Sequence, residues 1–182
     1  MRFGATLDRF MHLNRQTPAL LWSFAYFFCL LSGYYVLRPV RDAMGASSEV
    51  EAVFPSAMIT FFTAQGFPLK DLILQVLATF TFIFILIAQP LYGALVSKFP
   101  RRVFLPVLFG FFIACLFVFY VLFNSNVTGR GMAFFVWVTV FNVFSVSIFW
   151  SFMADIFNSH ESRKYYGYIG AAGTVGAFTG PI

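Results

Sequence analysis

The sequence predicts an all-helical integral membrane protein. Hydrophobic residues make up 60% of the chain and charged residues 10%, whereas soluble domains are about half apolar and about a quarter charged. Long uncharged segments recur, and none alternates apolar with polar residues as a half-buried strand does. Apolar segments of about 20 residues span a bilayer as helices, because helices satisfy their own backbone hydrogen bonds in lipid. The 28 phenylalanines are spread along the chain, which indicates lipid contact and helix packing rather than one binding patch.

Five segments are long enough to be membrane-spanning helices, and they are expected near residues 18–44, 72–97, 103–123, 131–157 and 165–182. A signal peptide is the poorer interpretation of the first, because Arg38 and Arg41 follow it where small cleavage-site residues should stand. The fifth span runs to the last residue. We therefore expect residues 18–182 to be the amino-terminal transmembrane bundle of a longer protein, with a small protein ending inside the membrane as the alternative.

The distribution of Lys and Arg predicts the orientation of the chain. The segments on one side of the expected spans carry Arg2, Arg9, Arg15, Lys98, Arg101, Arg102, Arg163 and Lys164, and those on the other carry Arg38, Arg41, Lys70 and Arg130. Positive charge accumulates on the cytoplasmic side, so residues 1–17 are expected to be a cytoplasmic segment. The net charge of +5 is explained by these loops, and no nucleic-acid partner is expected.

The loop between the first two expected spans, residues 45–71, contains an uncharged apolar patch from Val53 to Phe62. Such a patch is typical either of an interfacial helix or of a folded cap.

A charge cluster ends the first span and is the main candidate site. If the helix continues through Pro39 to about Gly45, then Tyr34, Arg38 and Arg41 share a face, and Asp42 follows Arg38 by four residues. Two guanidinium groups offer donors for phosphate or carboxylate, and the tyrosine could stack on a planar group. We predict an anion-binding site. The alternative is that both arginines extend to the interface and Arg38 pairs with Asp42.

A second polar stripe lies in the fourth span, where Ser147, Ser151 and Asp155 recur every four residues. Polar residues in a membrane helix face the bundle interior or a water-filled cavity. Ser151 and Asp155 are therefore predicted to act in gating or in coupling to an ion such as a proton. The alternative for Asp155 is a boundary carboxylate that pairs with Arg163 or Lys164.

The fifth span is rich in small residues and predicts close helix packing. Glycines recur at positions 167, 170, 173, 176 and 180, without the preceding strand or following Lys that a phosphate-binding loop needs. Small residues at this spacing let membrane helices approach closely, and Gly173, Gly176 and Gly180 are the predicted contacts.

Enzymatic chemistry is not expected. The two histidines, His12 and His160, have no metal-ligand spacing, and no Ser, His and Asp grouping can be argued. The predictions therefore include no catalytic residue, metal or cofactor. Cys29 and Cys115 lie within spans and are predicted to be small apolar fillers.

Two motifs resemble the major facilitator superfamily. The short basic segment 93–102 is similar to the loop between the second and third helices of that superfamily, with Ser97 in place of its acidic residue and Pro100 in place of its glycine. The segment from Gly176 to Pro181, with Gly180, is similar to the glycine-proline motif in the fifth helix of facilitator antiporters.

Three further segments resemble the ATP/ADP translocases of plastids and intracellular bacteria, namely residues 34–42, 149–152 and 163–167. In that family the first span ends in an Arg-Asp-x-Lys-Asp pattern. Arg38, Arg41 and Asp42 match it in charge and spacing, while Pro39 replaces an acidic residue and Arg41 replaces lysine. The sequence is most similar to bacterial facilitator-like relatives whose substrate is unassigned.

The resemblance implies a function as well as a fold. It implies twelve helices in two bundles, with this chain forming most of the first and a carboxy-terminal bundle as its partner. The implied activity is exchange of anionic metabolites such as ATP and ADP by alternating access, in a bacterial inner membrane. Arg38 and Arg41 would bind the anion, Tyr34 its planar part, and Asp155 would act in gating. The alternatives are a proton-coupled facilitator for another solute and a non-transporting membrane subunit.

Overall fold

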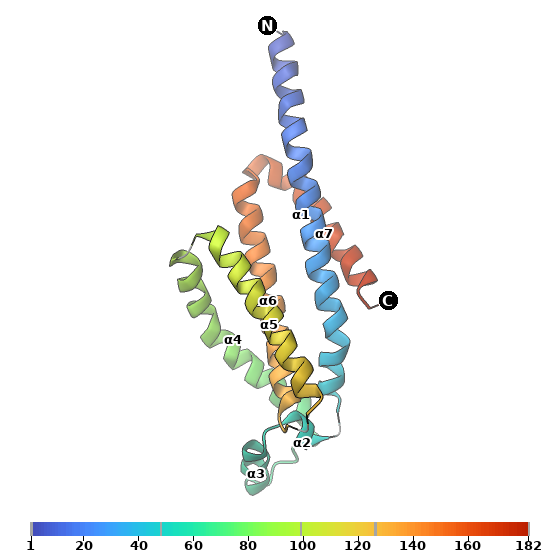
Figure 1. The fold of residues 1–182 in the computed structure, drawn as a ribbon, viewed down its shortest axis with the longest axis vertical. Helices are drawn as coiled ribbons and strands as arrows, with labels where there is room; N and C mark the ends of the chain where they lie inside the picture. Colours follow the sequence, from blue (N-terminus) through green and yellow to red (C-terminus); the bar gives the residue numbers. More distant parts are fainter. Residues whose placement is uncertain (1, 48, 99, 126, 182) are drawn as a thin grey trace. The chain divides into compact units, whose positions relative to one another are not determined.

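A computed structural model describes residues 2–47, 49–98, 100–125 and 127–181, and within these ranges the chain forms helices and no strands (Figure 1). The helices are α1 (Arg2–Gly45), α2 (Val50–Val53), α3 (Ser56–Ala64), α4 (Ile73–Lys98), α5 (Arg101–Phe123), α6 (Arg130–Ile156) and α7 (Ser159–Thr179). The predicted all-helical class is confirmed, and the facilitator-like arrangement stays a prediction.

The described residues include four helical segments that are long and apolar enough to cross a membrane: Pro18–Gly45, Ile73–Ala94, Val103–Phe123 and Arg130–Ile156. The protein is therefore a membrane protein. The fifth expected span forms α7, but α7 is not among the four, because its glycines and the charged residues of its first two turns make it less apolar.

The chain divides into two compact units, which we describe separately. Unit 1 comprises Met1–Pro39 and Asn142–Ile182, and unit 2 comprises Val40–Phe141. Unit 1 thus contains most of α1, the second half of α6 and all of α7. Unit 2 contains the last turns of α1, the helices α2 to α5 and the first half of α6.

Aromatic rings hold unit 1 together. Phe27 of α1 stacks on Phe149 of α6 with 4.4 Å between ring centroids, and Tyr26 meets the same ring edge-on at 5.1 Å. Trp150, the next residue of α6, packs edge-on against Tyr166 of α7 at 5.2 Å. Aromatic pairs at these distances contribute about 0.5–1.5 kcal/mol each beyond the burial of their area. The three helices of unit 1 are therefore joined through one line of rings.

Glycines bring the backbones of α1 and α7 together within unit 1. A Cβ atom added at Gly176 would lie 2.6 Å from the carbonyl oxygen of Phe28, and one at Gly180 would lie 2.6 Å from the carbonyl oxygen of Ser32. A Cβ at Gly173 would lie 2.5 Å from the ring of Phe27. No side chain fits at Gly176 or Gly180 unless the backbones separate, whereas one at Gly173 would have to displace the side chain of Phe27. The glycines predicted to pack do so against α1, whereas Gly167 and Gly170 have nothing within 4 Å of an added Cβ.

Unit 2 is also built on aromatic rings, which lie between α5 and α6. Phe119 packs against Trp137 and Phe134, both at 5.2 Å, and Phe112 meets Phe141 edge-on at 4.9 Å. Many other large side chains of α4 and α5 are exposed, as expected for helices that face lipid. The phenylalanines thus divide between helix packing and the outer surface.

The loop between α1 and α4 folds into a small cap with its own core. Val53 and Phe54 are completely buried and pack with Leu69, with Ile73 and Leu77 of α4 and with Phe135 of α6. Figure 1 shows α2 and α3 beside the beginning of α4. The folded cap that the sequence left as one of two alternatives is present, and it is joined directly to two of the candidate spans.

Replacing Gly129 with alanine should loosen this cap. Gly129 has a φ of +81°, its N–H donates to the carbonyl oxygen of Glu51, and an added Cβ would lie 2.9 Å from the side chain of Pro55. The positive φ alone costs about 1–2 kcal/mol for a residue with a Cβ. Gly66→Ala is the matched control, because Gly66 has a φ of +74° but nothing within 4 Å. We expect Gly129→Ala to lower the unfolding temperature more than Gly66→Ala does, and equal shifts would show that the Pro55 contact is unimportant.

Candidate functional site

Helix α1 continues through Pro39 to Gly45, as the site prediction requires. Pro39 has no N–H to donate to the carbonyl of Tyr35, so the helix lacks one backbone hydrogen bond there. The two units divide at the same residue. The predicted site residues therefore fall in two groups, with Tyr34 and Arg38 in unit 1 and Arg41 and Asp42 in unit 2.

In unit 1 the predicted ring and guanidinium are linked through a neighbouring tyrosine. Tyr34 is buried, and its ring meets that of Tyr35 edge-on at 5.2 Å. The Arg38 side chain is exposed, and its Cζ lies 5.3 Å from the centroid of the Tyr35 ring. A cation over an aromatic face at this distance is attracted by the ring electrons. Tyr35, which the sequence interpretation did not single out, orients Arg38.

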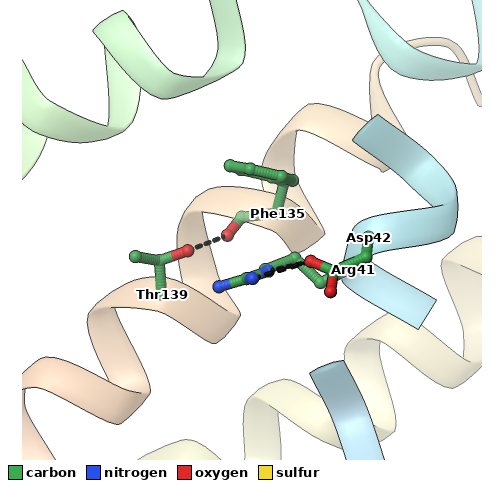
Figure 2. A network of polar contacts seen from close by, with 4 residues as sticks. All are labelled: Arg41, Asp42, Phe135 and Thr139. Carbon is green, nitrogen blue, oxygen red and sulfur yellow. Dashed lines mark hydrogen bonds and ion pairs between the residues drawn. The ribbon is translucent and has the colours of Figure 1, made fainter. Parts of the chain in front are cut away.

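In unit 2 the guanidinium of Arg41 is held between a carboxylate and a ring. Its Nε and Nη2 donate to Oδ1 of Asp42 at 2.9 and 2.6 Å, and its Cζ lies 5.4 Å from the centroid of the Phe135 ring. Figure 2 shows Arg41 beside the turn of α6 in which the Thr139 hydroxyl donates to the carbonyl oxygen of Phe135 at 2.8 Å. Only 17% of the Arg41 side chain is exposed, against 50% for Asp42.

The Arg41–Asp42 pair sets the electrostatics of this part of the site. A guanidinium has five N–H donors in a planar fork, and those on Nε and Nη2 donate to one oxygen of Asp42. Asp42 is the more exposed partner, so an incoming phosphate or carboxylate could replace it on the guanidinium without uncovering Arg41. The arrangement is suited to reversible binding of an anion. Asp42, predicted as a site residue, is an ion-pair partner of Arg41.

The second predicted stripe lies on α6 in unit 1. Ser151 is half-buried, Asp155 is exposed, and the Ser147 hydroxyl donates to the carbonyl oxygen of Val143 at 2.7 Å. The internal bond satisfies Ser147 within its own helix. Within unit 1, Asp155 therefore lies at the surface rather than in an apolar pocket.

Ser145 is the most deeply buried polar residue among those described, and the sequence interpretation did not single it out. Ser145 is completely buried in unit 1, and its hydroxyl has no hydrogen-bond partner among the described residues. Its position differs from that of Ser147 only in the helix face it occupies. Serine is common at packed membrane interfaces, so no sequence signal distinguishes it.

Unit 2 also contains an open cleft of about 470 Å³ beside the end of α1. Its lining includes Gly45, Ala46 and Ser47 together with Lys70 and Asp71. Both charged residues are exposed. The cleft is polar and of a size that holds small ligands, but it carries one charge of each sign and no excess of cations.

The described residues contain no group of three His, Cys, Asp or Glu side chains that could hold a metal ion. Comparisons with protein-family models, with curated proteins and with solved structures find no match for this chain.

Proposed function

We propose that the chain is part of a secondary active transporter that exchanges anionic metabolites, such as ATP and ADP, by alternating access. The observation that carries the proposal is Arg41, a largely shielded arginine near the end of a candidate membrane-spanning segment, held by Asp42 and Phe135. Ionisable residues inside membrane segments are costly and usually functional. The resemblance to ATP/ADP translocases suggests the substrate class, a bacterial inner membrane and a cytoplasmic amino terminus.

Substrate binding in this proposal is an exchange of anions on arginine. The phosphate of the substrate takes the place of Asp42 on Arg41, and Arg38 binds a second anionic group. The Arg41 guanidinium is paired with an anion both before and after substrate binds. It is therefore never left as an unpaired charge with little access to water. A nucleotide carries several negative charges, so further basic residues are expected from the carboxy-terminal bundle that the resemblance implies.

Alternating access requires rigid blocks that rock against each other. The contact between α1 and α7 in unit 1 supports such a block, because Gly176 and Gly180 bring backbone against backbone. Any movement of α7 would carry the adjoining part of α1 with it. Ser151 and Asp155, on α6 of the same unit, are assigned to gating.

Uptake of labelled ATP into vesicles that contain the full-length protein tests the proposal. Exchange predicts uptake into vesicles loaded with ADP and little uptake into empty ones. A proton-coupled facilitator, the alternative that uses Asp155, predicts uptake driven by a pH gradient with no internal nucleotide. A non-transporting subunit predicts no uptake in either condition, and either of the last two outcomes would overturn the exchange mechanism.

A further inference from the structure

We propose that the folded cap is also interfacial, and that its helix α3 lies in the membrane–water interface and binds lipid with its exposed face. This inference is independent of the transport activity. It concerns the cap formed by α2, α3 and the residues up to the start of α4 (Figure 1).

The two faces of α3 differ in what they contact. Met58, Ile59 and Phe62 pack against the buried core of the cap. The exposed residues Ala57, Thr60, Phe61 and Ala64 follow the helical spacing of three, four and seven residues and form the opposite face. One face of α3 thus packs on the core of the cap, and no described residue covers the other face.

The uncovered face is apolar and aromatic. Phe61 is 61% exposed and Phe67 is 54% exposed, and both rings meet the ring of Phe62 edge-on, at 5.6 and 6.0 Å. No charged residue occurs from Ala52 to Leu69, whereas Glu51 and Lys70 stand directly outside this segment. Aromatic side chains at the edge of an apolar segment are typical of the headgroup level of a bilayer.

The two threonine hydroxyls of α3 are already hydrogen-bonded within the helix, which lowers the free energy of moving them into lipid. The Thr60 hydroxyl donates to the carbonyl oxygen of Ser56 at 3.0 Å, and the Thr63 hydroxyl donates to that of Ile59 at 2.7 Å. These donors are satisfied within the helix, so they do not have to be stripped of water when the helix is buried.

The attachment of the cap places α3 at the required depth. The core residues Val53 and Phe54 pack directly on Ile73 and Leu77, in the first two turns of α4, and on Phe135 of α6. Both α4 and α6 contain candidate membrane spans. The cap therefore adjoins the beginnings of two candidate spans, since it shares its core with them. An uncharged surface with exposed rings beside the end of a membrane span favours lipid, rather than another protein, as its partner.

Spin labels attached to single cysteines test the inference in the full-length protein, reconstituted in phosphatidylcholine vesicles, with Cys29 and Cys115 replaced by alanine. One label is placed at Phe61, one at Ala57 on the same face, and a control label at Lys70, an exposed residue at the charged edge of the cap. Oxygen concentrates in lipid and a nickel chelate in water. We expect the labels at positions 57 and 61 to collide more with oxygen and the label at position 70 to collide more with the chelate.

Two outcomes would overturn the inference. Equal access of the chelate to positions 61 and 70 would mean that α3 faces water. Protection of position 61 from both reagents would mean that protein covers it, either a second copy or the remainder of the transporter. Because all three labels replace exposed residues, none should prevent folding.

Discussion

Replacing Gly176 with leucine should break the contact between α1 and α7 and should have the largest effect on stability of any single change considered. The added Cβ would lie 2.6 Å from the carbonyl oxygen of Phe28 and 3.2 Å from the backbone nitrogen of Ser32. Backbone atoms cannot rotate away as a side chain can, so the helices must separate. Overpacking of this kind costs about 1–3 kcal/mol and sometimes more. Thermal unfolding of the purified protein measures the loss.

The matched control is Gly167→Leu in the same helix. Gly167 is exposed, and a Cβ there meets nothing within 4 Å. Leucine is a better helix former than glycine by about 0.8 kcal/mol. The Gly167→Leu variant should therefore be as stable as the wild type or slightly more stable. Equal unfolding temperatures for Gly176→Leu and Gly167→Leu would contradict the close approach of α1 and α7.

Replacing Arg41 with glutamine should remove most of the affinity for anionic substrate. Hydrogen bonds to charged groups contribute about 1.5–3 kcal/mol each, which corresponds to a loss of about 10- to 100-fold in apparent affinity per bond. Arg41→Lys should recover only part of it, because an ammonium group cannot make the two parallel bonds of a guanidinium. The concentration dependence of exchange in vesicles measures both variants.

Lys70→Gln is the control for charge alone. Lys70 is an exposed cation of the same unit, at the cleft beside the cap, and its removal changes the net charge by the same amount. Exchange should be retained in this variant. A loss equal to that of Arg41→Gln would mean that the general positive charge of this surface, and not the Arg41 site, attracts the substrate.

The spans were predictable because lipid imposes a simple rule. A long uncharged segment in lipid must form its own backbone hydrogen bonds, which it does as a helix. The existence of α4, α5 and α6 therefore follows from the long stretches without charge. The cap was less predictable. Its core joins Val53 to Leu77 and Phe135, and contacts between residues so far apart in the chain leave no local pattern in a single sequence.

The pairing of the charges at the end of α1 shows a second limit. Sequence spacing offered a pair between Arg38 and Asp42 as the alternative to the anion site, since residues four apart are neighbours on a helix whereas adjacent residues are not. The structure contains an ion pair between Asp42 and the adjacent Arg41, whose guanidinium also lies near the ring of Phe135. Phe135 is distant in sequence, so this surrounding of Arg41 could not be anticipated.

The most direct test of the proposed anion site is the unfolding temperature of the full-length protein with and without ATP or ADP. Ligand that binds only the folded state stabilises it, by about 2.7 kcal/mol when its concentration is 100 times Kd. We expect the wild type to unfold at a higher temperature with nucleotide and the Arg38→Gln, Arg41→Gln double variant to show no such shift. Equal stabilisation of the double variant, or no stabilisation of the wild type by any nucleotide, would contradict the account.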